Sequence, residues 1–153
     1  MFQYKILNGI LPTNKFLHKI GYVDSPLCSF CNKELETIHH VFVECPHIKP
    51  LWVELSTWLK DTVNWNIEFK DIHVHLGFFR NIIGNMVLNH IILLTKHLIY
   101  CCKFKGTPPT ISLVVKNIKN VSDMELYIAR INCTTTQYFK KWSALYNYFN
   151  NFR

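Results

Sequence analysis

Apolar residues recur at helical spacing in two long parts of the chain. Between Ile48 and Leu59 they are three or four residues apart, which predicts an amphipathic helix after Pro46. From Phe78 to Phe104 the pattern predicts a buried helix, which the breaker-rich residues 105–109 end. Both segments predict a chain that is mostly helical.

The N-terminal residues have the pattern of a pair of short helices. A turn at Leu11-Pro12 is followed by Thr13 or Asn14 as a helix cap, and Gly21 suits the end of the second helix. The region predicted to contain strands comes later. There the apolar residues alternate with polar ones over a few positions each: Ile67, Phe69, Ile72, Val74 and Leu76.

The C-terminal part is predicted to form two further helices. The first covers residues 110–119, and Ser122 with Glu125 has the pattern of a capping box that begins the last helix. In the tail, aromatic residues at helical spacing predict a packing face, although stacking of bases between basic residues is the alternative. This face comprises Tyr138, Phe139, Trp142, Leu145, Tyr146 and Phe149.

Composition and charge narrow the class of protein. Hydrophobic residues make up 49% of the 153 residues, which is enough apolar surface for a folded chain. The net charge of +7 favours a polyanionic partner such as nucleic acid. The N-terminus lacks the apolar core of a secretory signal, so an intracellular location, nuclear or cytoplasmic, is expected. The most apolar stretch, residues 81–95, is too short and polar to span a bilayer, and no membrane partner is expected.

Six cysteines in a non-secreted chain indicate metal binding or buried thiols. Cys28 and Cys31 form a Cys-x2-Cys pair, and after eight residues His40 and Cys45 form a His-x4-Cys pair. Such pairs can surround one tetrahedral zinc ion. Because all four positions are filled by protein, the ion is predicted to be structural, and no hydrolytic chemistry is expected.

Alternatives remain for the cysteines and histidines. The thiols of the cluster could be simple core residues, a less favoured interpretation, and this is the expected state of Cys101, Cys102 and Cys133. His39 and His40 would point about 100° apart on a helix, and His40 is preferred as the ligand. A pair of ligands at His73 and His75 is disfavoured because no third ligand is near.

The metal motif resembles the zinc-binding domain that follows the polymerase in LINE-type (non-LTR retrotransposon) reverse transcriptases. In that pattern the histidine stands four residues before the last cysteine, so His40 fits and His39 does not. The flanking segments at residues 10–14, 36–40 and 45–52 also look like family sequence, as do residues 91–96 and 140–142 further on. The resemblance implies a C-terminal fragment of such a protein.

No polymerase active site is expected, because the chain contains no adjacent pair of aspartates. The fold predicted is mainly α: a small zinc-stapled helical module and a helical C-terminal region. Its parts are a helical pair with the zinc module at 1–61, a strand-like segment with the apolar helix at 62–106, and a helical tail at 110–153.

The leading functional hypothesis is a non-catalytic appendage that helps to hold RNA template or target DNA near a reverse transcriptase. No small-molecule substrate is expected. The predicted phosphate contacts are Lys15, Lys19, Lys33 and Lys49, which flank the zinc motif. The rival hypothesis is a structural module that braces the polymerase domain. An independent metalloenzyme is disfavoured by the closed ligand set.

Overall fold

The computed structural model describes residues 1–79 and 84–151, and it is mainly helical. No β-strand occurs in these residues, which contain one isolated bridge between Leu27 and Leu35. The predicted mainly α fold is therefore confirmed. The helices are α1 (Phe2–Leu7), α2 (Asn14–Lys19), the π-helical turn η1 (His40–Glu44), α3 (Lys49–Val63), α4 (Asp71–Leu76), α5 (Asn85–Lys103), α6 (Ile111–Ile131) and α7 (Thr135–Asn150).

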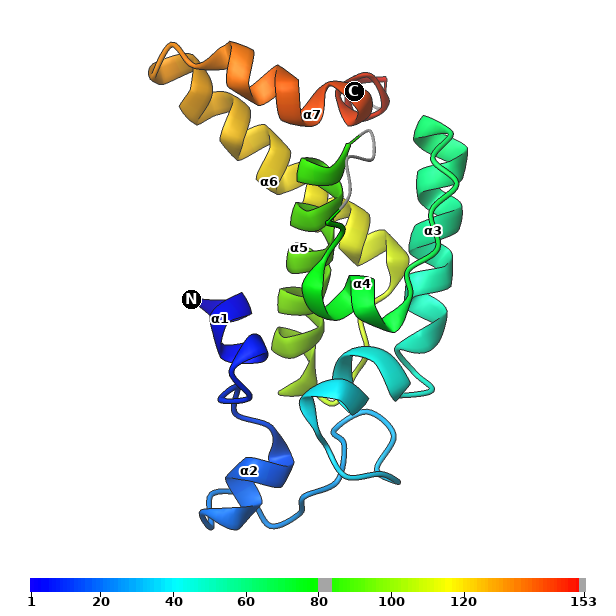
Figure 1. Ribbon diagram of the computed structural model, residues 1–153, viewed down its shortest axis with the longest axis vertical. Coiled ribbons are helices and arrows are strands. Elements are labelled where there is room, and N and C mark those ends of the chain that lie inside the picture. The colour runs from blue at the N-terminus through cyan, green and yellow to red at the C-terminus, as the bar shows by residue number, and fades with distance from the viewer. Residues whose placement is uncertain (80–83, 152–153) are drawn as a thin grey trace.

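Helix α5 is the centre of the arrangement (Figure 1). It packs against α6, α7 and η1, while α3 packs against α6 and α7. Helix α7 lies across one end of these helices, and α2 lies with the zinc-binding segment, residues 26–45, at the other end. Among the described residues, no helix combines the length and apolarity needed to cross a bilayer.

The core forms where the predicted apolar faces meet. Helix α5 contributes the fully buried Leu88, Ile91 and Ile99, and α3 contributes Leu55 and Leu59. Because the apolar residues of α3 stand three and four positions apart, they form one stripe along the helix, as its sequence predicted. The predicted start of the central helix at Phe78 is too early: residues 77–79 are not helical, and residues 80–83 lie outside the described residues.

The aromatic tail packs within the molecule. Tyr138, Trp142, Leu145 and Phe149 are buried, and α7 contacts α6, α5 and α3. Trp58 of α3 contacts this face, with its ring 6.5 Å from that of Phe149. Four of the six predicted residues thus form a buried packing face, while Tyr146 is half-buried and Phe139 is exposed.

The predicted capping box at Ser122 is wrong, because α6 continues without a break from Ile111 to Ile131. The Ser122 hydroxyl is buried and lies 2.9 Å from the Tyr138 hydroxyl of α7. Glu125 accepts hydrogen bonds from Lys141 and from the Trp142 indole. Both polar side chains therefore join two helices, and helix α7 begins only after a turn in which Cys133 has φ 55°.

The predicted strands are also absent. Residues 64–70 have no regular structure, and Asp71–Leu76 form the short helix α4. A strand needs a neighbouring strand for its backbone hydrogen bonds, and no such neighbour exists in the described residues. The alternation instead reflects separate contacts, such as Phe69 packing 5.4 Å from the Trp52 ring, while Val74 alone is buried in α4.

The helical pair at the N-terminus is present as α1 and α2, with Thr13 at the N-cap position of α2 and Gly21 at φ 72° just after its end.

The three downstream cysteines differ from their predicted state as buried core residues. Cys101 and Cys133 are exposed, and Cys102 is half-buried. Cys101 lies on the outer face of α5, and Cys133 lies in the turn between α6 and α7, so neither position faces the core.

A buried ion pair joins the zinc-binding segment to α5. The Lys103 ammonium lies 2.6 Å from the Glu36 carboxylate, and both side chains are at most 2% exposed. Glu36 also accepts hydrogen bonds from the backbone amides of Asn14 and Ser29, and Lys103 donates to the Asn14 side chain. These four residues are called the Glu36 junction below. They connect α2, the metal loop and α5.

Burial alone would raise the pKa of Glu36, but Lys103 and the amide donors outweigh it and hold that pKa below its ordinary value. Glu36 is therefore an ion at neutral pH. We expect Lys103→Met to lower the free energy of unfolding by about 3–5 kcal/mol, because it leaves a buried carboxylate without its cation. Urea unfolding of the zinc-loaded chain measures this loss.

The exposed Lys105→Met supplies the matched control and should change stability by less than about 0.5 kcal/mol. Glu36→Gln combined with Lys103→Met should recover part of the loss, because the uncompensated charge is then absent. If Lys103→Met lowered the free energy of unfolding by less than about 1 kcal/mol, Lys103 and Glu36 would not form a buried ion pair, because a loss of that size is typical of an ion pair on the surface.

Candidate metal centre

The first two metal ligands stand in a tight loop of the zinc-binding segment. The Cys28 amide donates to the Glu34 carbonyl and the Glu36 amide donates to the Pro26 carbonyl, so the loop closes on itself. Asn32 turns the chain with φ 53°. Backbone amides of Phe30 and Cys31 face the Cys28 sulfur, and those of Lys33 and Glu34 face the Cys31 sulfur. These donors favour sulfurs that carry negative charge.

The second pair of ligands stands at the two ends of η1. The Thr37 hydroxyl accepts a hydrogen bond from the His40 amide, so the helical turn starts next to Thr37. The Cys45 amide then donates to the His40 carbonyl at 2.8 Å, five residues back. This π-type bond spans the His-x4-Cys spacing and places both ligands at one site. The Trp52 indole holds the turn by donating to the Phe42 carbonyl.

The structure brings Cys28, Cys31, His40 and Cys45 together, with their ligand atoms all within 4.8 Å of one another and all four residues buried. The Cys28 and Cys45 sulfurs are 3.8 Å apart, and the Cys31 sulfur is 3.4 Å from His40 Nε2. Zinc bonds of about 2.3 Å to sulfur and about 2.0–2.1 Å to nitrogen give tetrahedral edges of roughly 3.8 and 3.6 Å.

These distances fit zinc and do not fit a disulfide, whose sulfurs would be about 2.05 Å apart. The donor set is three thiols and one imidazole, the composition of a structural Cys₃His site. All four coordination positions come from the protein, and the cluster is shielded from water. The cluster is a structural zinc site, and the predicted cofactor is confirmed.

The two neighbouring histidines have different positions. His40 is 5% exposed and turns Nε2 toward Cys31, while its Nδ1 lies 4.0 Å from Glu44. His39 points away from the cluster: its side chain is 45% exposed, and its Nδ1 lies 2.8 Å from Nε2 of His75 on α4. The two rings stack with their centroids 5.1 Å apart. The geometry therefore selects His40.

Burial raises the pKa of Cys28 and raises that of Cys45 to about 12. Burial also acts to raise the pKa of Cys31, but the Lys33 and Glu34 amides and His40 outweigh it and lower that pKa to about 7. Cys31 is thus the thiol that most readily becomes a thiolate when no metal is bound.

The four predicted phosphate contacts occupy different places. Lys15 and Lys19 are exposed on α2 and line a groove against the zinc-binding segment. Lys33 is exposed at the tip of the metal loop. Lys49, at the start of α3, lines a separate cavity that Glu68 and Asp71 also line. The structure therefore brings together only the first two of these lysines.

Sequence reasoning missed the Glu36 junction. Its central ion pair joins residues 67 positions apart, and no local pattern links them. The sequence contains only half of the signal that could have revealed this ion pair. Lys103 is a charged residue in a segment predicted to be a buried helix, and a buried lysine needs a partner. Which carboxylate supplies that partner depends on the tertiary fold.

We expect His40→Ala to lower zinc affinity by more than about tenfold, since even an outer-shell change can cost that much. His39→Ala is the matched control and should keep one zinc ion, because His39 lies outside the cluster. Native mass spectrometry of both variants beside the unchanged chain measures the metal content. Loss of zinc from His39→Ala but not from His40→Ala would contradict the assignment of His40 as the ligand.

Zinc binding should release about two to three protons per ion at neutral pH, because Cys28 and Cys45 are protonated in the metal-free chain and Cys31 is partly so. Affinity for zinc should therefore fall as the pH is lowered from about 8 to about 6. Calorimetric zinc titrations in buffers of different ionisation enthalpy count these protons. A proton release near zero would show that the thiols are already ionised without metal.

The metal centre lies within the part of the chain that matches a protein-family model. Residues 1–52, about a third of the chain, match the protein-family model described as zinc-binding in reverse transcriptase. No curated protein matches the chain closely enough to count as a relative. The match covers all four metal ligands and both helices of the N-terminal pair. It supports a zinc-binding, reverse-transcriptase-associated domain in the first third of the chain.

Proposed function

We propose that this chain is the zinc-stabilised, non-catalytic C-terminal portion of a LINE-type reverse transcriptase and that it helps to hold RNA template or target DNA. The proposal rests on one observation above all. The residues that match the reverse-transcriptase zinc domain also line a basic groove beside the metal centre. The net charge of +7 agrees with a polyanionic partner.

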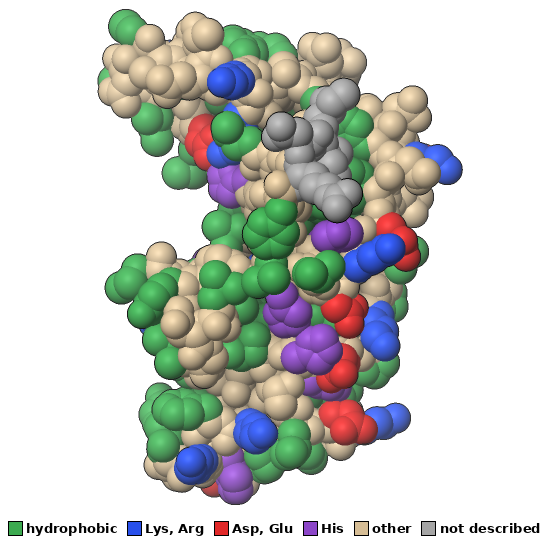
Figure 2. Space-filling model, viewed as in Figure 1, with side chains coloured by type: hydrophobic (Ala, Val, Ile, Leu, Met, Phe, Trp, Pro, Cys, Tyr) green, Lys and Arg blue, Asp and Glu red, His purple; other side chains and the backbone are tan. Residues whose placement is uncertain are grey.

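The groove lies between α2 and the zinc-binding segment and has a volume of about 710 Å³. Lys15, His18 and Lys19 stand on the α2 side, and His39 stands on the opposite side. No acidic residue lines this groove among the residues described. Figure 2 shows basic and histidine side chains over α2 on one face of the molecule, with histidine and acidic side chains gathered over α4.

The groove also offers an apolar surface to a base. Phe16 is 51% exposed and Leu35 is 48% exposed, and both line it. Lysines beside an exposed aromatic ring form the combination that binds single strands, because the charges meet phosphates while the ring stacks on a base. Lys49 suits this role less, since Glu68 and Asp71 share its surroundings. We therefore assign the phosphate contacts first to Lys15 and Lys19.

Zinc would act here by fixing the shape of the groove. Pro26, Leu35 and Thr37 line it and belong to the zinc-binding segment. The metal joins the loop that carries Cys28 and Cys31 to η1, and the Glu36 junction ties this loop to α2. Loss of the ion should therefore release one wall of the groove while the helices α5 to α7 stay packed.

The rival function is a structural module that braces the polymerase domain without touching nucleic acid. One observation favours it. Large apolar side chains are exposed in series along the N-terminal segment, a feature typical of a protein contact surface. They are Tyr4 (60%), Leu7 (54%), Ile10 (57%), Phe16 (51%), Ile20 (60%) and Tyr22 (77%).

A salt-dependent binding measurement separates the two functions. We expect the zinc-loaded chain to bind single-stranded RNA or DNA oligonucleotides with an affinity that falls steeply with salt. Lys15→Ala combined with Lys19→Ala should reduce the slope of log affinity against log salt by roughly 1.4 for single strands, about 0.7 for each phosphate that is no longer neutralised. Fluorescence anisotropy across a salt series measures both quantities.

Lys49→Ala is the control, because it removes a lysine from the same part of the chain but outside the groove. An equal effect of Lys49→Ala would indicate diffuse charge attraction and contradict the groove as the binding site. Absence of any salt-dependent binding by the zinc-loaded chain would overturn the nucleic-acid role and leave the bracing role as the better explanation.

A further inference from the structure

Helix α5 carries two buried lysines, and they are stabilised differently. Lys103 is ion-paired with Glu36 at 2.6 Å, which is the usual condition for burying such a charge. Lys96, two turns earlier on the same helix, is 1% exposed and forms no ion pair with any described carboxylate. The contrast within one helix identifies Lys96 as the residue whose burial lacks a structural explanation.

The immediate partners of Lys96 are neutral. Its ammonium donates to the side-chain oxygen of Gln3 at 2.6 Å and lies 3.4 Å from the His75 carbonyl. The Gln3 amide donates to the same carbonyl at 2.7 Å. These oxygens solvate the ammonium only in part. One of its three protons has no acceptor among these partners, and its charge has no counter-ion in the part of the chain that the structure describes.

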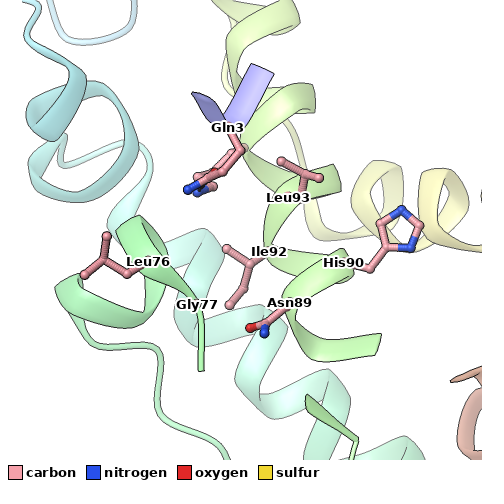
Figure 3. Close-up of a pocket in the computed structure, with 8 residues that line it drawn as sticks. Gln3, Leu76, Gly77, Asn89, His90, Ile92 and Leu93 are labelled. Carbon is pink, nitrogen blue, oxygen red and sulfur yellow. Dashed lines mark hydrogen bonds between the residues drawn. The ribbon is translucent and has the colours of Figure 1, made fainter. Parts of the chain in front are cut away.

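Lys96 forms part of the wall of a cavity of about 310 Å³ between α1, α4 and α5. Figure 3 shows Leu76 and Gly77 on one side of this space and Ile92 and Asn89 of α5 on the other, with Gln3 at one end. Leu93 adds a further apolar side chain to the wall. The volume is at the lower end of the range of about 300–1,000 Å³ found for small-molecule sites.

Of the other polar side chains in the wall, Asn89 is hydrogen-bonded, whereas His90 Nδ1 is buried without a hydrogen bond to any described residue and points away from the cavity. The Asn89 side chain accepts from the Phe78 amide and donates to the Phe78 carbonyl, so it is held against the chain. His90 turns toward α6, where its Nδ1 lies 3.6 Å from Glu125. The cavity is thus a mostly apolar space with one uncompensated cation in its wall.

We propose that this cavity binds a small aliphatic carboxylate, whose oxygen pairs with the Lys96 ammonium and whose short tail lies against Leu76, Ile92 and Leu93. A single available donor suits one carboxylate oxygen, whereas a phosphate group would require several donors. The cation excludes metal ions and amines. The small volume admits a chain of about four to six carbons and excludes a nucleotide.

Lys96 retains its charge for this role. Burial lowers the pKa of Lys96 to about 8, so the side chain is still mainly an ammonium ion at neutral pH. The site is independent of the zinc centre and of the nucleic-acid role proposed above. It implies binding without a reaction, so it is compatible with the expectation that the chain has no small-molecule substrate.

The test uses the zinc-loaded full chain and hexanoate as the probe, with ligand-observed and protein-observed NMR titrations. Hexanoate should bind with a dissociation constant on the order of 1 mM, a reasonable value for so few atoms. Hexanamide, the neutral analogue of equal length, should bind at least about tenfold more weakly, because it cannot supply the counter-charge. The perturbed amides should surround the cavity at Gly77 and Leu93.

Two variants locate the site independently. Lys96→Met keeps most of the length of the unbranched side chain and removes its charge, and it should weaken hexanoate binding at least about tenfold. Leu93→Phe keeps the charge and fills the cavity, and it should have the same effect. Lys116→Met, at an exposed position on α6, is the control and should leave binding unchanged.

Loss of folding in a variant is distinguished from loss of binding, because zinc content and the NMR fingerprint report whether each variant is folded. Lys96→Met should also raise the midpoint of thermal unfolding by a few degrees, since it removes an unpaired buried charge. Equal binding of hexanoate and hexanamide, unchanged binding in folded Lys96→Met, or no binding at concentrations far above about 1 mM would each overturn the proposal.

Discussion

The buried Glu36 carboxylate is the constraint on which the arrangement of this molecule depends. It lies in the metal loop, takes amide hydrogen bonds from α2 and from the loop itself, and pairs with Lys103 at the end of α5. A charge of this kind is stable in the interior only when every partner is in place. Glu36 therefore fixes how α2, the metal loop and α5 are placed relative to one another, although these segments are distant in sequence.

Zinc and this ion pair have different consequences for stability. Structural zinc sites have apparent binding free energies of about 10–16 kcal/mol, far more than a short loop could obtain from its own packing. The ion pair adds little net stability compared with an apolar replacement, but removing one partner is costly. The metal thus makes the loop fold, and Glu36 with Lys103 determines where the folded loop is attached.

This division explains what the sequence could predict. The metal ligands fall within 18 residues, and their spacing follows from local geometry such as the π-type bond between Cys45 and His40. The amphipathic face of α3 is equally local. The strands failed because alternation over a few residues does not reveal whether a partner strand exists, and the capping box failed because Ser122 pairs with Tyr138 of the next helix. The Glu36 junction required the tertiary fold.

The two lysines of α5 show how burial separates a structural role from a functional one. Both are spaced so that they share a face of the helix, and both are nearly inaccessible to water. A purely structural requirement for a cation in this helix is met at Lys103 by a carboxylate of the same chain. At Lys96 an apolar side chain would fill the same space at lower free energy, since desolvation of the ammonium is repaid only by neutral oxygens. The excess cost is explained if the missing negative charge comes from outside the chain, through the cavity that Lys96 borders.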